Sequence, residues 1–127
     1  MAEDDELDKQ FGWFHQFADL PREQLIAEAT ADNCASLSAL IESCLSDKPT
    51  LDTLSPDGFA DYVLGLRVNE RQWNQALCNA LIRAEELSQS EGKVAAASAL
   101  RSFAESCPWY QFRDVALNQA ASYVPRH

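Results

Sequence analysis

The chain has 127 residues, of which 46% are hydrophobic and 24% are charged, and its formal net charge is −10 at pH 7. This length suits a single domain, and the composition is that of a globular protein with a buried core. The acidic excess argues against binding to nucleic acid or to an anionic membrane, because both interactions need a basic surface. No apolar run approaches the length of a membrane span.

Residues 3–18 are predicted to form the first helix, because apolar side chains recur along one face at Leu7, Phe11, Phe14 and Ala18, widened by Trp13 and Phe17. Asp19 is expected to cap a second helix, with Leu25, Ile26 and Ala29 on its inner face. A third helix is expected to start at Asp32 or Asn33. Its apolar positions follow the helical period closely and are Leu37, Leu40, Ile41, Cys44 and Leu45.

Residues 50–55 are predicted to form a loop, after which Ser55 caps a helix that begins at Pro56. A break near Val68 and Asn69 is expected to separate this helix from a fifth one. The fifth helix carries the longest apolar stripe of the chain: Trp73, Ala76, Leu77, Ala80, Leu81, Ala84 and Leu87. Residues 88–92 then form a turn with Gly92 near the helix end, and a sixth helix follows with Val94, Ala97, Leu100 and Ala104 inside.

The last helix is predicted over residues 106–124, with Ser106 as its cap, Pro108 in its first turn and Pro125 after its end. Its inner face comprises Trp109, Phe112, Ala116, Ala120 and Tyr123, widened by Val115 and Leu117. The pattern as a whole predicts an all-α fold, a single-domain bundle of six or seven short helices over residues 1–127. We expect one core to hold Trp73, Leu77, Leu81, Phe112 and Ala116.

Motifs for catalysis or for metal binding are not found in this sequence. The four cysteines, Cys34, Cys44, Cys78 and Cys107, form no CxxC pair and lie in or beside apolar helical stretches, which favours buried, reduced thiols. Only two histidines are present, so a zinc site or a cysteine–histidine catalytic pair is not expected. We therefore expect neither an enzyme nor a bound metal or cofactor.

The acidic charge lies in the first half of the sequence. Residues 1–61 contain fourteen acidic and three basic residues, whereas residues 62–127 contain six and seven. This asymmetry favours a cationic protein partner, with solubility alone as the competing explanation. The predicted contact surface lies where carboxylates flank a loop and a helix start, with only Lys48 to offset them: Asp47, Asp52, Asp57 and Asp61. The acidic opening of the chain is unlike a secretory leader, so a cytoplasmic location is expected.

The segment FAESCPWYQFRDVALNQAASY, residues 103–123, resembles the C-terminal helix of small cytoplasmic immunity proteins that neutralise bacterial polymorphic or type VI effector toxins. The likeness lies in the Cys-Pro-Trp entry to the helix and in an ending with Asn118, Gln119 and Tyr123. It implies a stoichiometric inhibitor that binds one secreted toxin. The alternatives are an acidic helical adaptor or chaperone-like module for a basic protein, and a nucleic-acid mimic whose carboxylates form a phosphate-like array.

Overall fold

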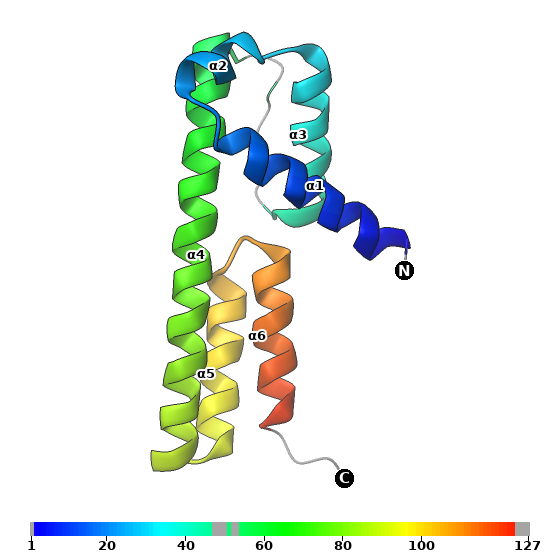
Figure 1. Ribbon diagram of the computed structural model, residues 1–127. Coiled ribbons are helices and arrows are strands. Elements are labelled where there is room, and N and C mark those ends of the chain that lie inside the picture. Colours follow the sequence, from blue (N-terminus) through cyan, green and yellow to red (C-terminus); the bar gives the residue numbers. More distant parts are fainter. Residues whose placement is uncertain (1, 47–50, 52–53, 124–127) are drawn as a thin grey trace. The chain divides into compact units, whose positions relative to one another are not determined.

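The computed structural model describes residues 2–46, 51 and 54–123, with side chains described from residue 7 onward. In these ranges the regular structure is six helices and no strand (Figure 1): α1 (Ala2–Ala18), α2 (Arg22–Ala27), α3 (Ala31–Cys44), α4 (Pro56–Ser90), α5 (Lys93–Ser106) and α6 (Tyr110–Ser122). The predicted all-α fold is confirmed. The chain divides into two compact units, residues 1–69 and residues 70–127, which are described separately below. The single domain expected from the chain length stays a prediction.

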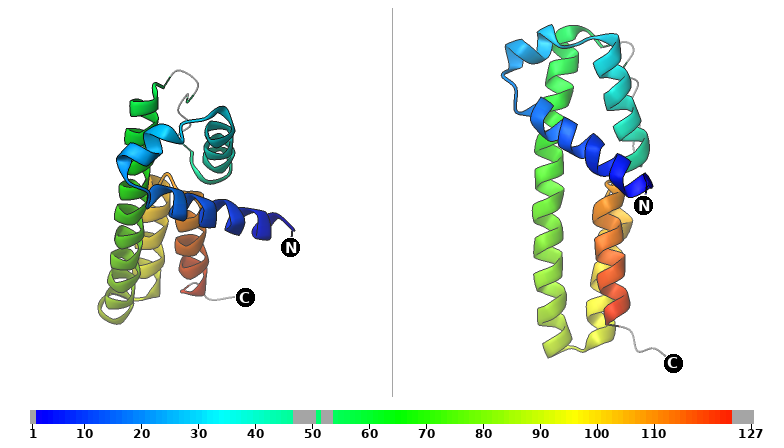
Figure 2. Two further views of the ribbon diagram at one scale, coloured as in Figure 1. Left: turned by 45° about the horizontal axis from the view of Figure 1, so that its top comes forward. Right: turned by 45° about the vertical axis from the view of Figure 1, so that its right-hand side comes forward.

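In residues 1–69, α1 packs across α3, as the views in Figures 1 and 2 both show. The apolar stripes predicted for the two helices supply much of the core, which includes Phe14, Phe17, Leu25, Leu37, Leu40, Ile41, Phe59 and Val63. The rings of Phe17 and Phe59 meet edge to face with centroids 5.9 Å apart, so α1 also packs on the first turns of α4. This packing positions α1, α3 and the start of α4 around one core.

The helix starts in this unit are fixed by local hydrogen bonds. The Ser55 hydroxyl accepts a hydrogen bond from the Gly58 amide at 3.0 Å, which confirms Ser55 as the residue that caps α4. The predicted cap of α2 is wrong, and α3 begins at Ala31, slightly before the expected Asp32 or Asn33. Asp19 donates its amide to the Gln16 carbonyl and so closes α1, while α2 begins after Pro21. For α3 the capping side chain is Thr30, whose hydroxyl accepts from the Asn33 amide at 3.2 Å.

The predicted helix break near Val68 and Asn69 is also wrong, because α4 runs unbroken for 35 residues. Valine and asparagine lower helix propensity by only a few tenths of a kcal/mol relative to the better helix formers. Apolar stripes on both sides of this point outweigh so small a preference. The two helices that the sequence suggested are therefore one.

In residues 70–127, the second part of α4 is followed by α5 and α6, and consecutive helices run in opposite directions (Figures 1 and 2). The amides of Glu91 and Gly92 both donate to the Leu87 carbonyl, at 2.7 and 2.9 Å, and Gly92 has φ of 102°. Gly92 therefore lies just past the end of α4 as predicted, in a positive-φ conformation that glycine adopts without strain, but the turn predicted over residues 88–92 is shorter because α4 continues to Ser90.

The predicted core of this unit is largely confirmed. Leu77, Phe112 and Ala116 are buried. Trp73 and Leu81 are half-buried, and the Trp73 ring meets that of Phe103 at 5.9 Å. The predicted inner residues Trp109 and Ala120 are also buried, as are Ala97, Leu100 and Ala104 of α5.

Three apolar side chains predicted to be buried face solvent instead. Val94 is 76% exposed because it lies in the first turn of α5, and Val115 and Leu117 are 45% and 46% exposed. The start of the last helix also differs from the prediction. Ser106 ends α5, and α6 begins at Tyr110, because Pro108 disfavours a helical conformation at Cys107. Val124 and Pro125 lie outside the described residues.

Candidate partner-binding surface

The division of the chain into two units coincides with the division of its charge. Residues 1–69 contain fourteen acidic and four basic residues, whereas residues 70–127 contain six of each. The first unit therefore carries the whole net charge of −10 and the second carries none. Among the described acidic side chains of the first unit the exposed ones are Asp8, Asp19, Glu23, Asp32, Glu42, Asp57 and Asp61. The acidic unit thus presents most of its described carboxylates to solvent.

Two of the four predicted contact residues lie together at the start of α4. Asp57 is in the first turn of this helix and Asp61 is one turn further on, so both project from the same side. Arg22, the first residue of α2, lies against both: its Nε donates to Asp61 Oδ1 at 2.8 Å, and its Nη2 is 3.6 Å from Asp57 Oδ1. The side chains remain open to water, with exposures of 47% for Arg22, 70% for Asp57 and 64% for Asp61.

Arg22 changes the electrostatics of this pair. The hydrogen bond from Arg22, and then its charge, hold the pKa of Asp61 below its ordinary value. The same contact raises the pKa of Arg22. The sequence-based view that only Lys48 offsets the predicted carboxylates is therefore wrong, since Arg22 neutralises part of their charge. Asp47, Asp52 and Lys48 lie outside the described residues.

The apolar neighbours of this site belong to the core. Phe59 is 1% exposed and Tyr62 is half-buried. Phe59 is thus not available to a partner, in line with the inward stripe of the sequence.

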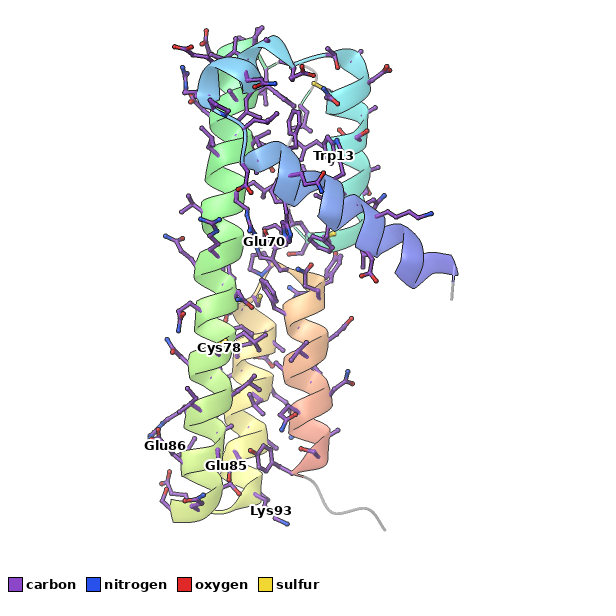
Figure 3. The ribbon with its side chains drawn as sticks, in the orientation of Figure 1. Trp13, Glu70, Cys78, Glu85, Glu86 and Lys93 are labelled. Carbon is purple, nitrogen blue, oxygen red and sulfur yellow. The ribbon has the colours of Figure 1, made fainter. Side chains whose placement is uncertain are left out.

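A groove of about 280 Å³ lies between α1 and α3 in the same acidic unit. It is lined by Lys9, Gln10 and Trp13 from α1 and by Ser36 and Ala39 from α3. Trp13 lies between the two helices (Figure 3) and is half-buried, whereas Ser36 and Ala39 are exposed and small. The indole stacks on the Phe17 ring, with centroids 5.0 Å apart and planes 17° from parallel. Trp13 is therefore anchored to the core while it lines an open groove.

Helical periodicity did not predict this groove, because it places Trp13 in the apolar stripe of its helix. A signal was present in the residues before it. Lys9 and Gln10 lie four and three positions earlier, on the same side of the helix as Trp13. Polar neighbours on that side indicate that the tryptophan sits at the border of the buried face, not at its centre.

A second groove of about 390 Å³ lies between α5 and α6 in the other unit. Its lining is Arg101, Ala104, Glu105, Arg113 and Leu117, with more basic than acidic side chains. The Arg113 Nε donates to the Cys107 carbonyl, and its guanidinium lies 5.4 Å from the centre of the Tyr110 ring. The unit around this groove carries no net charge, so it attracts a cationic partner less than the acidic unit does.

The cysteines and histidines show no catalytic arrangement in the described part of the chain. Cys44 and Cys107 are buried, Cys34 is half-buried, and Cys78 is exposed, against prediction. Burial raises the pKa of Cys107, so at neutral pH it is a thiol and not a nucleophilic thiolate. His15 packs beside the rings of Phe11 and Phe14, and His127 lies outside the described residues.

Much of residues 103–123, the segment singled out at the end of the sequence, has a structural role. Cys107 and Trp109 are fully buried, and the Tyr123 hydroxyl donates to Glu85 Oε2 at 2.9 Å, which ties the end of α6 to α4. This hydrogen bond raises the pKa of Tyr123. Asn118 and Gln119 are exposed, so a partner can reach them.

Within the described residues no group of three or more His, Cys, Asp or Glu side chains is placed to hold a metal ion. None of the helices described is both long and apolar enough to cross a membrane. Comparisons with protein-family models, with curated proteins and with solved structures found no match.

Proposed function

We propose that this protein acts by binding a basic protein partner through residues 1–69, and that it is an immunity protein that neutralises a cognate bacterial toxin in the cytoplasm. The observation that carries this proposal is the confinement of the net charge of −10 to one structural unit with exposed carboxylates. Solubility alone would not require the acidic excess to lie in one of the two units.

The chemistry of the partner follows from this surface. A toxin that attacks nucleic acid needs a basic cleft for its substrate, and an acidic protein can occupy such a cleft. Opposite charges also speed association, which suits an inhibitor that must reach its toxin before the toxin reaches its target. The acidic residues then determine the rate of encounter, while a few buried anchors determine how long the complex lasts.

Asp47, Asp52, Asp57 and Asp61 remain the proposed contact residues, with Arg22 as a modulator of the last two. Because Arg22 pairs with Asp57 and Asp61, it lowers the local negative potential that a partner meets. Loss of Arg22 should therefore strengthen the attraction of this surface for the basic partner, and loss of the carboxylates should weaken it.

The first experiment tests the biological role. Proteins encoded by genes beside the one for this chain are expressed alone and together with it. Growth arrest by one neighbour that is relieved by co-expression, together with a one-to-one complex of the two purified proteins, supports the proposal. Relief of growth arrest by none of the neighbours would contradict the immunity role.

The second experiment tests the surface on that complex. Arg22→Gln should accelerate association, whereas Asp57→Asn with Asp61→Asn, or Asp47→Asn with Asp52→Asn, should slow it. The matched control is Glu91→Gln with Asp114→Asn, which removes two exposed carboxylates from the uncharged unit. All differences should shrink in high salt, because salt screens exposed charges. Equal rates for the paired variants and the control would place the interface elsewhere.

A further inference from the structure

The groove between α1 and α3 has the features of a site for a single inserted side chain. Its volume of about 280 Å³ is just below the range of about 300–1,000 Å³ for ligand pockets. Its α3 side is formed by Ser36 and Ala39, whose short side chains leave the helix surface open to a partner. Its α1 side holds the large apolar surface of Trp13, a residue type that dominates binding energy in many interfaces.

Trp13 is also held in place before any partner arrives. It stacks on Phe17, and Phe17 in turn meets Phe59 edge to face in the core. A rotamer fixed by such packing loses little conformational entropy on binding, so contact with it contributes more to affinity than contact with a mobile side chain. This distinguishes Trp13 from the exposed apolar residues of the other unit, such as Val94, which is 76% exposed.

The surroundings of the groove indicate the charge of its occupant. Asp32 is exposed and lies one helical turn before Ser36, on the same side of α3. On α1 the charged residue in the groove's lining is Lys9, which is basic, so the acidic surroundings come from the α3 side and from the rest of the unit. The unit as a whole carries fourteen acidic residues against four basic ones. An apolar anchor in a strongly acidic surface matches a basic segment that carries one apolar side chain among lysines or arginines.

We propose that the α1–α3 groove is the docking site for such a segment of the partner, which inserts one apolar side chain against Trp13 and Ala39 while its basic neighbours face Asp32. This inference rests on the proposed function and names the anchor that the charged surface alone does not supply. It also separates the roles of two regions: the carboxylates around Arg22 promote encounter, and the groove retains the bound partner.

The test uses two fluorescein-labelled helical peptides of lysine and alanine that differ at one central position, which is leucine in the first and alanine in the second. Fluorescence anisotropy at low salt measures their binding to the full chain. The leucine peptide should bind about tenfold more tightly, because a buried leucine side chain is worth at least one decade of affinity. Both affinities should fall as salt is added.

Substitutions at Ala39 separate insertion from charge. Because Ala39 is exposed, Ala39→Arg and Ala39→Glu should fold normally, and each fills the groove with a long side chain. Both should abolish the tenfold preference for leucine. The controls Ala121→Arg and Ala121→Glu make the same changes at an exposed alanine of α6 and should preserve it.

The outcomes distinguish this inference from the function on which it rests. Two results would mean that charge alone governs binding and would overturn the proposal that the groove is a docking site. One is equal binding of the two peptides. The other is that Ala39→Arg weakens and Ala39→Glu strengthens the binding of both peptides to the same extent. The proposal of an acidic partner surface would survive either result. Absence of binding by both peptides at low salt would overturn both proposals.

Discussion

Replacing Phe112 by alanine tests the core of residues 70–127 most directly. Phe112 lies in α6, is 8% exposed, and its ring centroid is 6.1 Å from that of Trp109. Burying about 150 Å² of aromatic surface at about 25 cal/mol per Å² contributes about 4 kcal/mol. Alanine retains a small part of this contribution, and the cavity left behind adds a further cost. Phe112→Ala should therefore lower the free energy of unfolding by about 3–5 kcal/mol, the range for buried phenylalanine.

The assay is urea unfolding followed by far-UV circular dichroism, with Val115→Ala as the matched control. Val115 lies three residues further along the same helix and is 45% exposed, so its truncation should change stability by no more than about 0.5 kcal/mol. A loss below about 1 kcal/mol for Phe112→Ala, or one equal to that of the control, would refute the burial of this face of α6.

Three further predictions concern α4 and its surroundings. Gly65→Ala should stabilise the protein by about 0.5–1 kcal/mol, because an added Cβ meets no atom within 4 Å in the interior of a continuous helix. Gly92→Ala should destabilise the protein, because Gly92 has a positive φ. Thermal melting of both variants measures these changes, and a destabilising Gly65→Ala would argue for a break in α4. The hydrogen bond from the Tyr123 hydroxyl to Glu85 raises the pKa of Tyr123 in the folded protein, so the stability it contributes should be lost as pH rises above about 10 and the hydroxyl loses its proton. Tyr123→Phe should make the free energy of unfolding, measured by chemical unfolding, fall less steeply over this alkaline range. Cys78 is exposed, so the folded protein should label rapidly there with a maleimide, and Cys78→Ser should remove that fast reaction in mass spectra; unchanged labelling would show that another thiol is accessible.

Periodicity predicted the fold well where one face of a helix is fully buried. The five apolar positions predicted for the third helix, from Leu37 to Leu45, are all buried, with Leu45 just past the last residue of α3. Periodicity failed where a helix lies on the surface of its unit. Val115 and Leu117 are apolar yet exposed, because the buried side of α6 is already filled by Phe112, Ala116 and Ala120. Composition alone does not distinguish the centre of a buried face from its border.

Helix boundaries depended on local chemistry that several residues could supply. Ser55 before Pro56 was a strong signal and was confirmed, since serine bonds to an amide two or three residues on and proline fits the first turn. Around α3, three neighbouring polar residues were each able to cap a helix, and Thr30 does so. Only the backbone path decides which of them has the right geometry.

The candidate site was partly visible in the sequence. The charge asymmetry and the i, i+4 spacing of Asp57 and Asp61 required no structure. The pairing with Arg22 did require one, because Arg22 is 39 residues from Asp61 along the chain. The groove at Trp13 likewise depends on how α1 crosses α3, which no local pattern records.

The bridge from Arg22 to Asp57 and Asp61 has a consequence for how the sequence can diverge. A substitution that removes any one of these three residues changes the environment of the other two, so the three positions are expected to vary together. Exposed acidic residues such as Asp32 and Glu23 do not pair with Arg22 in the described structure. A lineage that adapts to an altered partner therefore has more freedom at those positions, and change should accumulate there first while the bridge is inherited as a unit.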